Sequence, residues 1–233
     1  MIFVFLSLLL NGAALFGNPP VRPAAFSEAD YAKYDHRTFP KLKAAQQPLE
    51  LANIDYDLLE AAIFYATNVQ RVKAKRKPFA FAPYLRKAAV LHATQMVKRQ
   101  FFDHQNKYDP KYRIFTQRID ASGGKGKYSS AGENIADSFL LTYREGTAYS
   151  DETDAAGNTY FVDEAGKPIL PHTYWSLAEA VLEQWMNSPG HRANILDANY
   201  THLGCGSRRL SAAEDDEIAS TRSVQVFARA IVP

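Results

Sequence analysis

The stretch Trp185-Met-Asn-Ser-Pro-Gly-His-Arg-Ala-Asn-Ile-Leu196 carries the most information about the fold of this chain. Its histidine, His191, follows a Pro-Gly pair, and that pair predicts the boundary of a structural element. Upstream, Gly132-Glu-Asn-Ile135 places Glu133 directly after a glycine. Polar side chains at element boundaries are well placed to face a cleft. The two segments together predict that Glu133 and His191 each contribute a side chain to one shared site.

A third polar residue ends the segment Phe101-Phe-Asp-His104. We expect this segment to be the loop after a helix, which leaves His104 free to face the same cleft. His92 lies within the apolar stripe of that helix and is interpreted as a hydrogen-bonded core residue. The sequence therefore predicts a site made of His104, Glu133 and His191.

The composition indicates a globular protein with a substantial core. Of its 233 residues, 46% are hydrophobic and 12% aromatic, and the length suits one large domain or two small ones. The formal net charge of +2 gives no general attraction to nucleic acid or to acidic membranes, so nucleic acid is excluded from the expected partners. Cys205 is the single cysteine, which excludes an internal disulfide. We interpret it as a small buried residue on a strand.

The sequence predicts a targeting signal at the N-terminus. Residues Met1 to Phe16 are nearly all apolar, but the run is shorter than the roughly 20 residues of a membrane span. Small residues follow, so 1–17 is predicted to be a signal peptide cut near Ala14 or Gly17. An uncleaved anchor is the alternative, because no lysine or arginine precedes the run. We expect a secreted, periplasmic or cell-envelope protein whose mature form has no integral membrane span.

The remainder divides into a lead segment and one domain. Residues 18–50 are rich in proline and predict an extended N-terminal segment with room for one short helix, and the domain is assigned to 51–233. Turn signals within 144–173 predict a β-hairpin insertion. Three helices are expected, the first capped by Asn53 or Asp55 and ending near Lys75, the second from Pro83 to about Phe101, and the third from Tyr174 to Asn187.

Strands are expected near the C-terminus. Residues 203–208 and 223–232 have strand patterns, with an acidic turn at 213–217 between them. We expect Gly132 to Ala136 to lead into a short helix. Helices followed by antiparallel strands indicate an α+β layered domain.

An ordered set of motifs now matches a known family. The motifs are Ala88-Ala-Val-Leu-His-Ala-Thr-Gln-Met96, Phe101-Phe-Asp-His104, Gly132-Glu-Asn-Ile-Ala136, Trp185 to Leu196 and Leu203-Gly-Cys-Gly206. The chain resembles the CAP superfamily of cysteine-rich secretory, antigen 5 and pathogenesis-related (SCP-like) proteins, in the bacterial secreted form without disulfides. The resemblance implies an α-β-α sandwich with an antiparallel sheet and an open cleft.

The resemblance also implies a ligand set in that cleft. Its two histidines fall on His104 and His191 and its first glutamate on Glu133, with Asn134 beside it. The second glutamate of the family falls on Ser188, a departure. Glu183 does not replace it, because five helical positions rotate a side chain by roughly 140°.

Two chemistries and two functions stay open at this point. His104 and His191 are expected to bind Zn²⁺ or another divalent metal weakly, while a polar cluster that braces the cleft is the alternative. We favour a secreted, monomeric binding module that holds a lipid, peptide or glycan. The alternative is a metal-dependent, peptidase-like hydrolase in which Glu133 is a metal ligand or the catalytic base.

Overall fold

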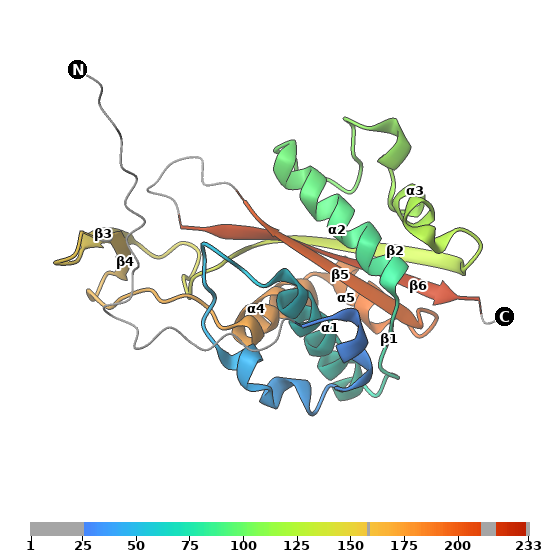
Figure 1. The fold of residues 1–233 in the computed structure, drawn as a ribbon, viewed down its shortest axis with the longest axis horizontal. Coiled ribbons are helices and arrows are strands. Elements are labelled where there is room, and N and C mark those ends of the chain that lie inside the picture. Colours follow the sequence, from blue (N-terminus) through green and yellow to red (C-terminus); the bar gives the residue numbers. More distant parts are fainter. Residues whose placement is uncertain (1–25, 158, 211–217, 232–233) are drawn as a thin grey trace, which may run out of the picture.

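A four-stranded sheet lies between two layers of helices (Figure 1). The computed structural model describes residues 26–157, 159–210 and 218–231, so the predicted signal peptide 1–17 and the acidic turn at 213–217 lie outside the described residues. The strand order is β1-β5-β6-β2, in which only the β1–β5 pair is parallel. The strands are β1 (Ala80–Phe81), β2 (Tyr128–Phe139), β5 (His202–Arg209) and β6 (Ser220–Ala230).

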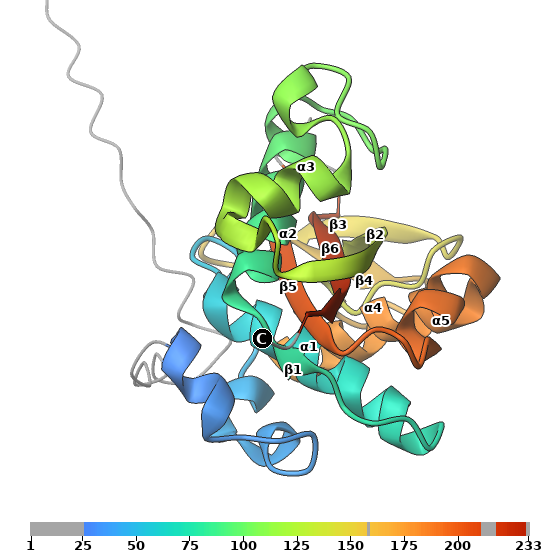
Figure 2. The ribbon, with the colours of Figure 1, turned by 90° about the vertical axis from the view of Figure 1, so that its right-hand side faces the viewer.

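The helices cover both faces of this sheet (Figure 2). On one face lie α2 (Pro83–Lys98) and α3 (Phe115–Ile119), and on the other α1 (Tyr56–Lys73), α4 (Tyr174–Asn187) and α5 (Pro189–Leu196). Each face has its own cluster of buried apolar side chains. The predicted α+β architecture, an α-β-α sandwich, is therefore confirmed.

Local sequence signals explain where the long helices begin. Asp55 caps α1, because its carboxylate accepts a hydrogen bond from the Leu58 N–H at 3.0 Å. Pro83 is the first residue of α2, where its missing N–H costs nothing. Thr173 caps α4 by accepting from the Ser176 N–H at 3.0 Å.

Two glycines on β5 set the distance between the sheet and α2. A Cβ atom on Gly204 would overlap the backbone of Arg86, and one on Gly206 would overlap the backbone of Ala89. Cys205 lies between them and is 1% exposed, as expected for a small buried residue on a strand. The Leu203 to Gly206 motif therefore serves close helix–sheet packing.

The segment around Glu133 was predicted incorrectly. Gly132 to Ala136 do not lead into a helix; they form the middle of β2 and pair with β6 over its full length. Both faces of this part of β2 are buried, so it lacks the alternating polarity by which a half-exposed strand is recognised. His191 lies in the first turn of a further helix, α5. This helix begins directly after α4, because Pro189 is its first residue.

Residues 26–50 differ from the extended segment expected there. They form three short 3-10 helices, Glu28–Ala32, Phe39–Lys41 and Lys43–Gln46. Phe39 is fully buried, and its ring stacks on Tyr65 of α1 with centroids 4.4 Å apart. Ala45 and Leu49 join the same core cluster. Burial of these apolar groups makes the segment part of the domain, ahead of residue 51.

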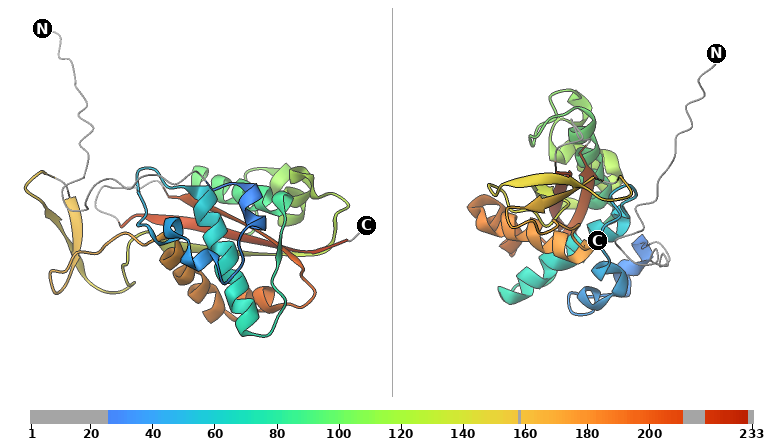
Figure 3. Two further views of the ribbon diagram at one scale, coloured as in Figure 1. Left: turned by 60° about the horizontal axis from the view of Figure 1, so that its bottom comes forward. Right: turned by 90° about the vertical axis from the view of Figure 1, so that its left-hand side faces the viewer.

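The insertion 144–173 contains the hairpin that its turn signals predict. Strands β3 (Tyr149–Thr153) and β4 (Thr159–Asp163) pair with each other as a separate two-stranded sheet. The hairpin stands at one end of the molecule, away from the sandwich (Figure 3).

Two further short turns precede β2, a 3-10 turn at Pro110–Tyr112 and a π-helical turn at Asp120–Gly124. Within the described ranges, no helix has the length and apolar character needed to cross a membrane.

Candidate functional site

His104 and Glu133 are in direct contact. His104 lies in the loop after α2, as predicted, and its Nδ1 is 3.0 Å from Oε1 of Glu133 on β2. The imidazole is 48% exposed while the carboxylate is 1% exposed. The hydrogen bond to Glu133 raises the pKa of His104 above its ordinary value, although burial opposes this. Because Nδ1 donates to the carboxylate, the opposite nitrogen, Nε2, is the one free to meet a ligand.

Arg118 of α3 completes the surroundings of Glu133. Its Nη2 donates to Oε2 of Glu133 at 2.7 Å and to the His104 carbonyl at 3.1 Å. Its Nη1 donates to the carbonyls of Tyr112 and Arg113. Arg118 therefore ties the strand residue to the loop that carries His104. Sequence reasoning missed it, since no motif distinguishes this arginine from its exposed neighbours.

The charge state of Glu133 follows from these partners. Burial opposes ionisation, but the hydrogen bond with His104 and the charges of His92 and Arg118 outweigh it and lower the pKa of Glu133. Both carboxylate oxygens are engaged, Oε1 by His104 and Oε2 by Arg118. A carboxylate held in this way is an anchor for its neighbours and a weak base.

His92 lies behind the same carboxylate and is fully buried. Its Nε2 donates to the Asp103 carbonyl at 3.0 Å and lies 3.7 Å from Oε1 of Glu133. Burial lowers the pKa of His92 to about 4, so the ring is neutral at pH 7. Its interpretation as a hydrogen-bonded core histidine is confirmed.

Asn134 connects the strand to the helix of His191. Its Nδ2 donates to the His191 carbonyl at 3.1 Å and to Gln225 Oε1 at 3.0 Å, and its Oδ1 accepts from Asn194 at 2.9 Å. The Asn134 side chain is fully buried in this network. It is therefore a structural link between β2 and α5, and it holds the backbone of His191 in place.

His191 faces a groove next to the cluster. Burial lowers its pKa, and the charge of His104 contributes to this shift, which places the two imidazoles within electrostatic range. Among the contacts of the described residues, none joins the His191 ring directly to His104 or Glu133. The structure thus joins His104 to Glu133 and leaves His191 at the edge of the groove.

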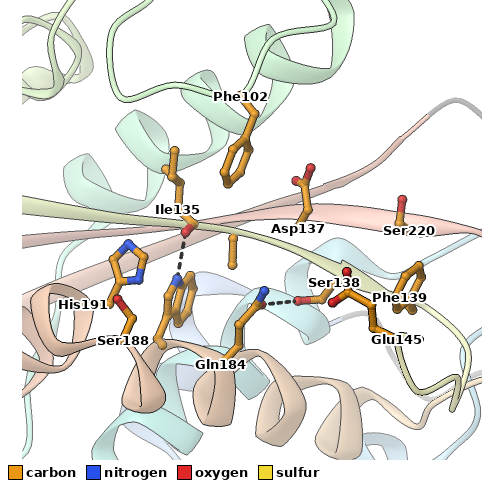
Figure 4. A pocket seen from close by; sticks show the side chains of 12 residues that line it. Phe102, Ile135, Asp137, Ser138, Phe139, Glu145, Gln184, Ser188, His191 and Ser220 are labelled. Atoms are coloured by element: carbon orange, nitrogen blue, oxygen red, sulfur yellow. Dashed lines mark hydrogen bonds between the residues drawn. The ribbon is translucent and has the colours of Figure 1, made fainter. Parts of the chain in front are cut away.

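The groove has a volume of about 490 Å³ and runs along β2 beside α4 (Figure 4). Its lining consists of Phe102, Ile135, Ala136, Asp137, Ser138, Phe139, Glu145, Gln184, Trp185, Ser188, His191 and Ser220. Two contacts fix its floor, from Trp185 Nε1 to the Ile135 carbonyl at 3.0 Å and from Ser138 to Gln184 at 3.1 Å. Ser188 lies beside His191 at one end, and Glu183 is exposed and outside the lining.

These residues fit a metal ion only in part. Within the part of the chain that is described, no group of three His, Cys, Asp or Glu side chains is placed to hold one. Glu133 has both oxygens engaged, so the protein ligands available are Nε2 of His104 and the ring of His191. A two-imidazole set falls short of the three protein ligands typical of catalytic zinc.

The layered fold and this His/Glu cluster define the class of protein. The family described as the cysteine-rich secretory protein family, CAP, matches residues 64–226, and the chain belongs to this family. It is 29% identical over 147 residues to the uncharacterized protein YkwD and 28% identical over 150 residues to the uncharacterized membrane protein YlbC, both of Bacillus subtilis. These matches cover 63% and 64% of this chain but only 41% and 32% of the two relatives.

Solved structures of similar proteins exist as well. One is an extracellular protein with an SCP domain from Bacillus anthracis, 22% identical with a TM-score of 0.48, matched over 76% of this chain and 42% of that chain. Another is an outer surface protein from Borrelia burgdorferi, 15% identical with a TM-score of 0.46, matched over 74% of this chain and 93% of that chain.

Proposed function

We propose that this protein is an extracellular binding module whose groove along β2 holds an extended ligand. The observation that carries the proposal is the groove itself, which combines the rings of Phe102 and Phe139 with the polar groups of Ser138 and Gln184. Ligand sites in proteins are concave and largely apolar, with a few polar groups that orient the ligand. The extracellular location rests on the signal peptide predicted at residues 1–17.

The binding role is favoured over hydrolysis by the state of Glu133. A general base needs a carboxylate with a free oxygen and a pKa near the working pH. Glu133 has neither, because Arg118 and His104 engage its two oxygens and its pKa is lowered. Ser188 stands where the family pattern has a second glutamate. The cluster is therefore better suited to bracing the loop of His104.

We also propose that His104 and His191 together hold a divalent ion weakly at the end of the groove. Glu133 would then act behind His104, fixing the ring with Nε2 outward, as carboxylates commonly do for histidine ligands. A bound ion would supply a Lewis-acid contact for a carbonyl or anionic group of the ligand.

A binding survey of the full chain tests the proposal. Labelled peptide pools, glycan oligomers and phospholipid vesicles would be titrated against the wild type and against Gln184→Trp, which fills the groove from the exposed surface of α4. Glu183→Trp, one residue away and outside the lining, is the matched control.

We expect one ligand class to bind and Gln184→Trp to weaken it by about tenfold, the loss of roughly 1.4 kcal/mol of contact. Binding by no class, or equal binding by both variants, would overturn the proposal. Turnover of a peptide or ester panel that a chelator abolishes would favour the hydrolase alternative.

A further inference from the structure

The two ends of the groove differ in charge. His191 and Ser188 lie at one end, and Phe139, Glu145 and Ser220 lie at the other (Figure 4). Glu145 reaches the groove from the loop between β2 and the β3–β4 hairpin. The lining contains two carboxylates, Asp137 and Glu145, and neither a lysine nor an arginine.

The fold accounts for one of these carboxylates. Asp137 pairs with Arg222, whose Nε lies 3.1 Å from Oδ1 of Asp137. Arg222 also donates to the carbonyls of Met96 and Phe101, so this pair belongs to the framework of the sheet. Glu145 has no ion pair or hydrogen bond to any other described residue. Its charge is therefore the uncompensated one at this end of the groove.

The backbone of β2 offers a second recognition element. β2 is the edge strand of the sheet, and its outward carbonyls at Glu133 and Ile135 accept from the side chains of Asn194 and Trp185. Residues two apart on a strand direct their backbone groups the same way, so Asp137 presents its N–H and C=O along the same edge. No side-chain bond to these two groups occurs within the described ranges. The edge is therefore free at Asp137, where an extended peptide can pair with it as a strand.

We propose that the groove binds an extended peptide along the outer edge of β2, with a lysine or arginine side chain of the peptide against Glu145. This proposal rests on the proposed function and names its ligand class. The backbone of Asp137 pairs with the peptide main chain, the rings of Phe102 and Phe139 contact its apolar side chains, and Glu145 selects the cation. Glu145 is exposed, so its attraction for that cation is modest and is screened by salt.

Peptide pools with capped termini test the selectivity. One position of a hexapeptide pool would be fixed as lysine, norleucine or glutamate, and binding to the full chain would be measured by fluorescence anisotropy at low and high salt. We expect the lysine pool to bind roughly two- to fivefold more tightly than the norleucine pool at low salt, as for a partly exposed ion pair. High salt should remove this preference.

Variants assign the preference to one residue. Glu145→Gln should abolish it and Glu145→Lys should reverse it in favour of the glutamate pool, whereas Glu183→Gln, an equal charge change outside the groove, should keep it. A lysine preference that survives Glu145→Gln, or a wild type without any preference, would overturn this inference and leave the binding module in place. Failure of every pool to bind, with glycans or vesicles binding instead, would overturn it by naming another ligand class.

Discussion

Arg118 and Glu133 form an ion pair in which each side chain is only 1% exposed, with 2.7 Å between Nη2 and Oε2. The pair joins a short helix to the centre of β2, and the remaining hydrogen bonds of Arg118 hold the loop that carries His104. The exposed histidine therefore depends for its position on a buried arginine that no ligand can reach.

Arg118→Met should destabilise the protein severely. Removing one partner of a buried pair leaves an uncompensated charge and typically costs about 3–5 kcal/mol. The free energy of unfolding in urea is the measurement, and Arg113→Met, at an exposed neighbouring arginine, should change it by less than about 0.5 kcal/mol. The double change Arg118→Met/Glu133→Met should recover part of the loss. Equal stability of Arg118→Met and Arg113→Met would show that the Arg118–Glu133 pair contributes nothing to the stability of the fold.

His92 should make the protein less stable in mild acid. Its folded-state pKa of about 4 is below the ordinary value of 6.5. Between pH 4 and pH 6.5 the unfolded chain therefore binds a proton that the native state does not bind. The stability that His92 supports is complete above pH 6.5 and is lost as the pH falls toward 4, by up to about 3 kcal/mol. Burial of the ring is the largest cause of this low pKa; the charge of Glu133 opposes the shift, and the charges of Arg118 and His104 add to it.

The contribution of His92 can be isolated by comparison with His92→Gln, whose amide can still donate to the Asp103 carbonyl. Urea unfolding at several pH values between 4.5 and 7.5 should show a shallower acid slope for the variant. The other histidines with lowered pKa values, His172, His191 and His202, titrate in both proteins and cancel in the difference. Parallel curves for the two proteins would contradict the prediction.

Local signals predicted the elements that depend on local interactions. Asp55, Pro83 and Thr173 mark helix starts because a cap or a proline acts within one turn of the chain. β2 was misjudged because its pairing partner, β6, is almost a hundred residues away and both its faces are buried.

The candidate site shows the same division between local and distant information. His104 was found through its position after a helix, and Glu133 through its motif. Arg118 acquires its significance from its bonds to the His104 loop and to Glu133 on β2. Glu145 acquires its significance from its place in the groove lining beside residues of α4 and β6, so composition and spacing carry no signal for either residue. The burial of Phe39 likewise depends on α1 and α4, which come later in the chain.

Gly206→Ala should destabilise the sandwich. The added methyl group would overlap the α2 backbone at Ala89, and neither the strand nor the helix can move without disturbing the core. Overpacking of this kind costs typically about 1–3 kcal/mol, measured by thermal or urea unfolding. Gly190→Ala is the matched control, because a Cβ there meets open space within a helix and should stabilise by about 0.4–1 kcal/mol. A neutral Gly206→Ala would show that α2 does not lie so close to β5.

The imidazoles of His104 and His191 should bind zinc weakly. Zinc titration followed by calorimetry should show weak binding to the wild type and at least about a tenfold loss in His104→Ala/His191→Ala, since two of the few available ligands are removed. Affinity should fall as the pH decreases through the raised pKa of His104, because the protonated ring cannot coordinate. His36→Ala, on the N-terminal segment, should titrate like the wild type and serves as the control. Identical titrations of the wild type and the double variant would refute the metal proposal and leave Glu133, His104 and Arg118 as a brace for the groove.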